Sequence, residues 1–142
     1  MRHELTNSDD IIDSRDILER FEELKTERDD LADAVEEAEG DEDTEHAQNL
    51  FEAWQEDNEA EYTALEKLIE QCEGYGDFAH GETLIREDYF ETYAQELADD
   101  IGAIDRKAAW PTNHIDWEAA ADELRQDYME VDFAGTTYLM RA

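Results

Sequence analysis

Apolar side chains recur with a seven-residue repeat along residues 13–73. In the first part of this stretch the repeat positions are Ile17, Phe21, Leu24, Leu31, Val35 and Ala38. In the second part they are Ala47, Phe51, Trp54, Tyr62, Leu65, Leu68, Ile69 and Cys72. Two helices with matching apolar seams and a short connection predict an antiparallel coiled-coil hairpin.

Capping signals place the ends of these two helices. Asp13 or Ser14 can cap the first helix, which we expect to run to about Glu39, before Gly40 ends it. Thr44 is a suitable cap for the second helix. The hairpin is therefore expected to have a five-residue turn at residues 40–44.

One polar layer is predicted inside the hairpin. When the two seams are paired about the turn, Leu24 faces Tyr62 and Arg28 lies level with Asn58. Arg28 and Asn58 are the polar breaks in their seams, and Glu61 is close by. A polar layer shared by two helices fixes their register at some cost in stability. We therefore predict a layer formed by Arg28, Asn58 and Glu61.

The segments on either side of the hairpin have different patterns. Residues 1–12 are polar apart from the pair Ile11 and Ile12, and they predict a loose N-terminus that can dock through these two side chains. Glycines after residue 73 interrupt the helical pattern, so residues 74–82 are expected to be a connector. Residues 83–142 then predict a small α+β domain.

Two helices are expected in this domain. Asp88 followed by Glu91 resembles a capping box, and the apolar face of that helix extends to Ile104. Asn113 or Asp116 can cap a further helix. Trp110 and Trp117 are interpreted as side chains that pack this domain.

Short strands complete the prediction. Residues 83–86 have the composition of a strand, residues 129–133 alternate between apolar and acidic, and residues 136–141 can return after a turn at Ala134 and Gly135. The predicted fold class is α+β and mainly helical. It combines the N-terminal hairpin with two helices and a short β-hairpin or three-stranded sheet.

The charge changes what this architecture implies. The chain has 43 acidic and 11 basic residues, a net charge of −32, yet 40% of its residues are hydrophobic. High net charge usually indicates disorder, but periodic apolar residues indicate a folded protein with an extreme surface. Such a surface repels nucleic acid, which excludes it as a direct partner. It favours cationic partners, among them proteins with basic nucleic-acid-binding grooves.

Salt adaptation is an alternative explanation of the acidity. Acidic surfaces keep proteins soluble at high salt, and the chain has three lysines against eight arginines, which suits a halophile-adapted protein of unknown role. Cys72 is the only cysteine, which fits a reducing compartment. No secretory signal and no membrane span are visible, so the expected location is the cytoplasm.

Candidate chemistry is sparse. The histidines His3, His46, His80 and His114 are scattered, and Cys72 on the apolar seam is interpreted as a core thiol. The run from Asp41 to Glu52 has the oxygen spacing of a calcium loop, but His46 stands where such loops need glycine. We therefore expect no enzyme activity, no metal and no cofactor.

Charge density gives the hairpin a candidate role. Residues 14–73 hold 23 acidic and five basic residues, a net charge of −18. Over a rod of roughly 39 Å this is about one negative charge per 2 Å, whereas duplex DNA has about one per 1.7 Å. Two packed helices are also about as wide as a duplex. Carboxylates at this spacing can compete for a basic groove.

The C-terminal part shows a family resemblance. The relevant segments are 89–102, the run His114-Ile-Asp-Trp-Glu-Ala-Ala-Ala-Asp-Glu-Leu, and the hairpin from Asp132 to Tyr138. Over residues 83–141 the chain resembles proteins of bacteriophages and mobile elements, and the C-terminal part of the ArdA-type antirestriction proteins. That family consists of DNA mimics that inhibit host restriction enzymes, and some phage anti-CRISPR proteins act similarly. The N-terminal hairpin is not part of the ArdA pattern.

These observations predict a non-enzymatic phage-type inhibitor of a host nucleic-acid-binding defence system, which acts as a DNA mimic in the host cytoplasm. The partner-binding residues are expected to be the acids of the distal hairpin, with three more from the C-terminal domain: Asp29, Asp30, Asp33, Glu36, Glu37, Glu39, Asp41, Glu42, Asp43, Glu45, Glu52, Glu56, Asp57, Glu59, Asp99, Asp100 and Glu123. The C-terminal domain can also mediate formation of a homodimer. An alternative is a coiled-coil adaptor or assembly protein that binds a partner helix.

Overall fold

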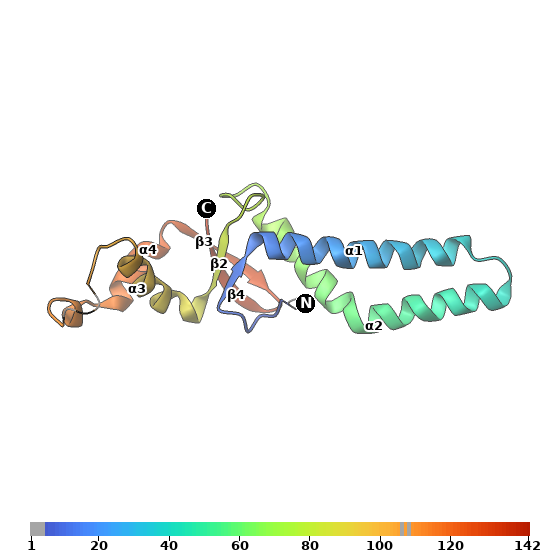
Figure 1. Ribbon diagram of the computed structural model, residues 1–142, viewed down its shortest axis with the longest axis horizontal. Coiled ribbons are helices and arrows are strands. Elements are labelled where there is room, and N and C mark those ends of the chain that lie inside the picture. The colour runs from blue at the N-terminus through green and yellow to red at the C-terminus, as the bar shows by residue number, and fades with distance from the viewer. Residues whose placement is uncertain (1–4, 106, 108) are drawn as a thin grey trace.

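Two long antiparallel helices dominate the computed structural model, which describes residues 5–105, 107 and 109–142. Helix α1 (Ser14–Glu37) and helix α2 (Asp41–Cys72) are joined by three residues and lie side by side (Figure 1). The remaining helices are α3 (Phe90–Asp100) and α4 (Trp117–Arg125), with short 3-10 helices at Glu87–Tyr89 (η1) and Thr112–His114 (η2). The fold is mixed α+β, and the coiled-coil geometry of the hairpin stays a prediction.

A four-stranded antiparallel sheet lies at the centre of the molecule. Its strands are β1 (Ile11–Asp13), β2 (Thr83–Arg86), β3 (Tyr128–Phe133) and β4 (Thr136–Arg141), in the order β1-β2-β4-β3. Strands β3 and β4 are joined by Ala134 and Gly135, whose φ angles of 51° and 86° are both positive. Such angles are typical of the two-residue turns that close β-hairpins. This hairpin and strand β2 confirm the strands expected in residues 83–142.

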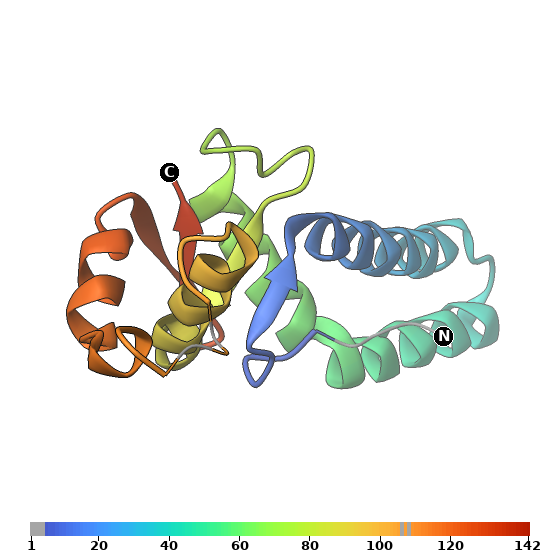
Figure 2. The same ribbon diagram turned by 60° about the vertical axis from the view of Figure 1, so that its left-hand side comes forward.

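Alternation along the strands divides the core into two layers. Leu84 pairs with Met140 and packs in the core shared with α1 and α2, whereas the next pair, Ile85 and Leu139, packs against α3 and α4. This is the two-residue period of a sheet that is covered on both faces. The two pairs of helices therefore lie on opposite sides of the sheet (Figures 1 and 2).

The N-terminal segment differs from its prediction as a loose end. Ile11, Ile12 and Asp13 form β1, whose backbone pairs with β2, and Ile12 is buried. Before it, Leu5 is buried, and the Asn7 side-chain amide donates to the carbonyl oxygen of Ala134 at 3.0 Å. Residues 83–142 contribute three strands, as expected, but the sheet has a fourth strand from the segment that was expected to be loose. A three-residue strand is too short for its alternation to be recognised in the sequence.

The cap of α1 confirms one prediction, and the start of α2 corrects another. Asp13 caps α1, because its carboxylate accepts a hydrogen bond from the Arg15 amide at 2.9 Å. Helix α2 begins at Asp41, directly after Gly40 with its positive φ of 84°. Thr44, the predicted cap, lies inside the helix, and its hydroxyl donates to the Gly40 carbonyl oxygen at 2.8 Å. The turn is therefore shorter than predicted.

Burial of the largest apolar side chains falls off along the hairpin from the sheet to the turn, although the small side chain of Ala47 near the turn is still buried. Ile17, Leu24 and Leu65 are fully buried in the core shared with the sheet, whereas Val35 is half-buried and Leu50 is 48% exposed. Gln71 strengthens the sheet end, because its amide donates to the carbonyl oxygen of Asp132 and accepts from the same residue's N–H at 2.8 and 2.7 Å. The half nearer the sheet is anchored, and the other half projects from it.

The segment between α3 and α4 departs most from its prediction. Helix α3 ends at Asp100, so Ile101 does not extend its buried face and is 70% exposed. The residue after the helix cap, Gly102, has a φ of 76°, a left-handed conformation that commonly ends helices. Trp110 is 73% exposed, which overturns its interpretation as a packing residue, whereas Trp117 is half-buried on α4. Asp116 caps α4 as predicted, accepting from the Ala119 amide at 3.1 Å.

Candidate acidic interaction surface

The strongest concentration of charge lies on the half of the hairpin nearest the turn, residues 29–59, which we call the distal arm. Between Arg28 and Lys67 the sequence has no lysine and no arginine, but it has 16 acidic residues. The distal arm forms one end of the elongated molecule, opposite α3 and α4 (Figure 1). It is therefore a surface with charge of a single sign.

The predicted acids of the distal arm are solvent-exposed with one exception. Thirteen of the fourteen are exposed, and only Glu59 is half-buried. The exposed ones are Asp29, Asp30, Asp33, Glu36, Glu37, Glu39, Asp41, Glu42, Asp43, Glu45, Glu52, Glu56 and Asp57. No ion pair joins any of these thirteen to a basic residue within the described ranges. Their carboxylates are free for an external cation.

Helical periodicity explains why the acids point outward. Leu31 and Val35 lie four residues apart on the partly buried face of α1, and the acids occupy the positions between and after them. Residues three and four apart share one face of a helix, so the residues between them lie on the other faces. Asp41 and Asp43 also have a local role, because carboxylates in the first turn of α2 interact favourably with its dipole.

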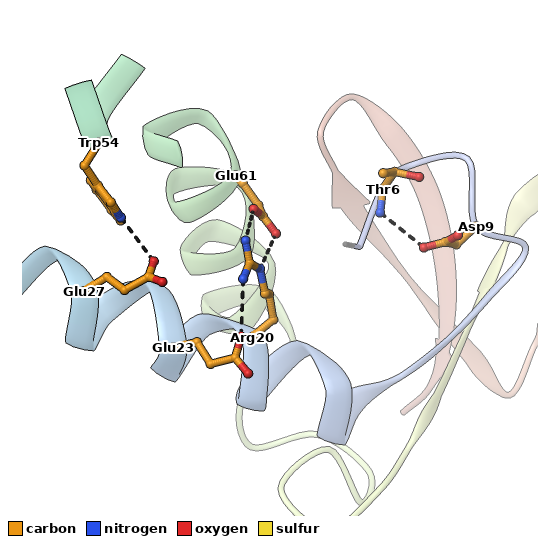
Figure 3. A network of polar contacts seen from close by, with 7 residues as sticks. All are labelled: Thr6, Asp9, Arg20, Glu23, Glu27, Trp54 and Glu61. Atoms are coloured by element: carbon orange, nitrogen blue, oxygen red, sulfur yellow. Dashed lines mark hydrogen bonds and ion pairs between the residues drawn. The ribbon is translucent and has the colours of Figure 1, made fainter. Parts of the chain in front are cut away.

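Two basic residues of α1, Arg20 and Arg28, contact α2 instead of covering the acids. The guanidinium of Arg20 makes two hydrogen bonds with the Glu61 carboxylate, both at 2.8 Å, and a third with Glu23 at 3.2 Å (Figure 3). The Arg20 and Glu61 side chains are only 16% and 14% exposed. These contacts raise the pKa of Arg20, with Glu61 as the main cause. The pair is an internal clamp between the helices.

The predicted polar layer of Arg28, Asn58 and Glu61 is wrong in its partners. Asn58 donates to the Trp54 carbonyl oxygen of its own helix at 3.1 Å, and Glu61 is occupied by Arg20. Arg28 instead lies 3.9 Å from the Glu59 carboxylate, with its guanidinium carbon 5.1 Å from the ring centroid of Tyr62. This explains why Glu59 is the least exposed of the predicted acids.

Two further contacts between the helices were not predicted. The Trp54 indole N–H donates to the Glu27 carboxylate at 3.2 Å (Figure 3). Phe21 stacks on Tyr62 with ring centroids 5.1 Å apart. The predicted register had placed Leu24 opposite Tyr62. The seam indicated which residues face inward, but the pairs depend on side-chain length, which the repeat does not specify.

The three predicted acids of the C-terminal part lie away from the distal arm. Asp99 and Asp100 end α3, and Glu123 lies on α4 beside a shallow 310 Å³ hollow that Leu124 and Asp127 help to line. All three predicted acids are exposed. Because α3 and α4 lie at the end of the molecule opposite the distal arm, these acids do not form one surface with it (Figure 1).

The described residues provide little for catalysis or metal binding. Asp41 to Glu52 are continuous α-helix, so they do not form the loop that a calcium site of that spacing requires. No group of three or more potential metal-ligating side chains is brought together among residues 5–105, 107 and 109–142. Cys72 is fully buried, and burial raises the pKa of its thiol to about 12. It is a core residue, as its place on the seam predicted.

Comparison with known proteins identifies no relative. No protein-family model, no curated protein and no solved structure matches this chain. The resemblance of residues 83–141 to the ArdA-type proteins therefore stays a prediction. Within the described part of the chain, no helix combines the length and the apolar character that crossing a bilayer requires.

Proposed function

We propose that the protein is a non-enzymatic inhibitor of a nucleic-acid-binding host defence complex, and that its distal arm occupies the basic groove in place of DNA. The observation that carries this proposal is the set of thirteen exposed carboxylates without an internal cation on the distal arm. The same helices direct Arg20 toward α2, where it pairs with Glu61. The outer surface of the arm is thus left to an external basic partner.

Charge spacing supports the comparison with DNA. Helix α1 has 24 residues and is about 36 Å long at ~1.5 Å per residue. The net charge of −18 over residues 14–73 gives about one charge per 2 Å of that length, close to the ~1.7 Å of a duplex. Binding of such a rod to a basic groove releases counterions, as DNA binding does. Its affinity should therefore fall steeply as salt rises.

Charge reversal tests whether the arm is the binding surface. We expect Glu36→Lys, Glu37→Lys, Glu52→Lys and Glu56→Lys together to abolish binding to the target and inhibition of it. These positions are exposed and avoid the first turn of α2, where carboxylates stabilise the helix. Circular dichroism should show unchanged helix content.

The matched control reverses four exposed acids at the other end of the molecule: Asp99→Lys, Asp100→Lys, Asp122→Lys and Glu123→Lys. It has the same net charge as the arm variant, so retained inhibition would show that the location of the acids matters. Equal loss in both variants would point to net charge alone, and full inhibition by the arm variant would refute the proposal.

A second candidate is an adaptor whose hairpin binds a partner helix. The observation that favours it is Leu50, which is 48% exposed on the distal arm beside the half-buried Phe51. A helix packing there would bury apolar surface, so its affinity would change little with salt. Under this candidate Leu50→Ser weakens partner binding more than the four-lysine arm variant does.

A further inference from the structure

The loop that joins α3 to α4, residues 101–115, has a composition opposite to that of the distal arm. It contains one acidic residue, Asp105, and two basic residues. No other window of 15 residues in the sequence has a net positive charge. The described residues of this α3–α4 loop lie at the end of the molecule farthest from the α1–α2 turn (Figure 1).

Large apolar side chains are exposed on the same loop. Trp110 is 73% and Ile101 70% exposed, which are the two highest values among the large hydrophobic residues that the structure describes. Ala103, Ala109 and Pro111 are also exposed. Large exposed apolar side chains on a segment with little charge are typical of a protein–protein contact, and tryptophan is enriched at the centres of such contacts.

Hydrogen bonds hold two points of the loop among its described residues. The Ile101 amide donates to the Leu97 carbonyl oxygen at 3.0 Å, which fixes the start of the loop on the end of α3. The Thr112 hydroxyl donates to the Asp105 carbonyl oxygen at 3.2 Å and joins its two halves. Ile101 is thus held at the end of α3, and the segment before Trp110 is tied to the one after it, which lowers the entropic cost of ordering them on binding.

We propose that the α3–α4 loop is the contact surface for a second copy of this chain, joined end to end. Two chains that each carry a net charge of −32 repel wherever acidic surfaces meet, so their mutual repulsion is smallest where acidic residues are fewest. A basic partner, in contrast, would be drawn to the acidic arm and away from Lys107. The distribution of charge therefore favours self-association through the α3–α4 loop.

The loop is also self-complementary. Asp105 and Lys107 are both exposed and two residues apart, so a two-fold axis between them places the lysine of one copy near the aspartate of the other. The distal arm lies at the end of the molecule opposite α3 and α4 (Figure 1), so the two arms would point outward from opposite ends of such a dimer. Both arms stay accessible, and a bivalent target would be bound with higher avidity. This contact does not depend on what the arms bind.

Sedimentation velocity over a concentration series tests the proposal on the full chain. The wild type is expected to form a dimer, and added salt should strengthen that dimer because it screens the repulsion between the two chains. The double variant Ile101→Ser and Trp110→Ser should raise the dissociation constant at least about tenfold, the cost of losing an interface hot spot. Lys107→Glu should weaken the dimer at low salt.

The matched control is Leu50→Ser, which removes an exposed leucine from the distal arm and should leave the dimer unchanged. Far-ultraviolet circular dichroism checks that all variants fold, since each substituted side chain is exposed. A wild type that stays monomeric in high salt would overturn the proposal. So would a dimer that survives the loop double variant, a dimer that is lost in Leu50→Ser, or assembly beyond a dimer.

Discussion

Arg20 illustrates how single residues hold together a chain with so few cations. Its guanidinium contacts two carboxylates, one on each long helix, in an environment that is 16% exposed. Hydrogen bonds to charged groups that are largely removed from water stabilise more than exposed ion pairs do. Arg28 differs, because its guanidinium lies 3.9 Å from the Glu59 carboxylate without a hydrogen bond to it and packs over the ring of Tyr62.

Replacement of Arg20 should therefore destabilise the fold more than the loss of one positive charge explains. Arg20→Ala leaves Glu61 partly buried without its partner, and we expect a loss of about 2 kcal/mol in the free energy of unfolding. Lys25→Ala removes the same charge from an exposed position of α1 and is the control. Urea unfolding measures both, and equal effects would show that the clamp adds nothing.

Cys72 gives a second test at the residue scale. Burial raises the pKa of its thiol to about 12, so at pH 8 the thiol is almost entirely protonated, and its side chain is fully buried. We expect Ellman's reagent to leave the native protein unmodified at pH 8 and to react completely in urea. Because the pKa is raised, reactivity should increase only far above pH 8 or on unfolding. Rapid native labelling would contradict the buried position.

The sequence predicted which residues face inward, but not all of their partners. Arg28 was recognised as a polar break in the seam, yet its partner proved to be Glu59 and not Asn58. Asn58 bonds a carbonyl of its own helix, which is a short-range alternative that the repeat cannot exclude. Periodicity specifies a face of a helix, whereas pairing depends on register and side-chain reach.

The two long helices differ in how firmly their halves are held. Near the sheet, Ile17 and Leu68 are completely buried. Near the turn, the side chain of Leu50 is 48% exposed. Like charges along the distal arm add repulsion. Helix stability in proteins comes mainly from tertiary packing, so the two halves should differ in local stability.

Amide hydrogen exchange should show this gradient along α1 and α2. Amides around Leu24 and Leu65 are expected to exchange only through global unfolding, whereas those from Leu31 to Leu50 should exchange through local opening, at rates at least tenfold faster. The control is β4, whose central amides should match the slow group. Uniform protection along both helices would indicate a continuous tight seam and would support the coiled-coil prediction.

Among the helices and strands, the sequence predicted best those with a long periodic pattern or a characteristic turn sequence. The helices α1 and α2 and the β3–β4 hairpin were predicted, because a heptad repeat and an Ala-Gly turn are local signals. Strand β1 was missed because its partner β2 lies about 70 residues away in the sequence. The exposure of Trp110 was not predicted, because a large apolar side chain is usually expected to pack in the core.

The whole molecule is elongated, with its acidic arm and its least acidic loop at opposite ends (Figure 1). The candidate site could be predicted in the arm, because helical periodicity separates exposed acids from the seam. It could not be predicted that Asp99, Asp100 and Glu123 lie at the other end, since that depends on how the helices flank the sheet. The arm alone therefore forms the candidate binding surface.

The salt dependence of the free energy of unfolding should show how strongly repulsion between the acids of the distal arm destabilises the fold. The free energy of unfolding of the wild type is expected to increase with salt, because exposed like charges are screened beyond about 10 Å at 0.1 M ionic strength. A variant with Glu36→Gln, Glu37→Gln, Glu52→Gln and Glu56→Gln should be more stable than the wild type at low salt. The difference should vanish at high salt. A wild type that is unfolded at low salt would instead support salt adaptation.

Competition with DNA tests the central claim most directly. Three immobilised proteins are exposed to a bacterial lysate freed of nucleic acid: the wild type, the arm variant with lysines at positions 36, 37, 52 and 56, and the α3–α4 control with lysines at positions 99, 100, 122 and 123. Bound proteins are then displaced with duplex DNA and identified. The proposal predicts a nucleic-acid-binding protein that is retained by the wild type and the α3–α4 control, released by duplex DNA, and not retained by the arm variant. Retention by the arm variant, or a bound partner that duplex DNA does not displace, would contradict it.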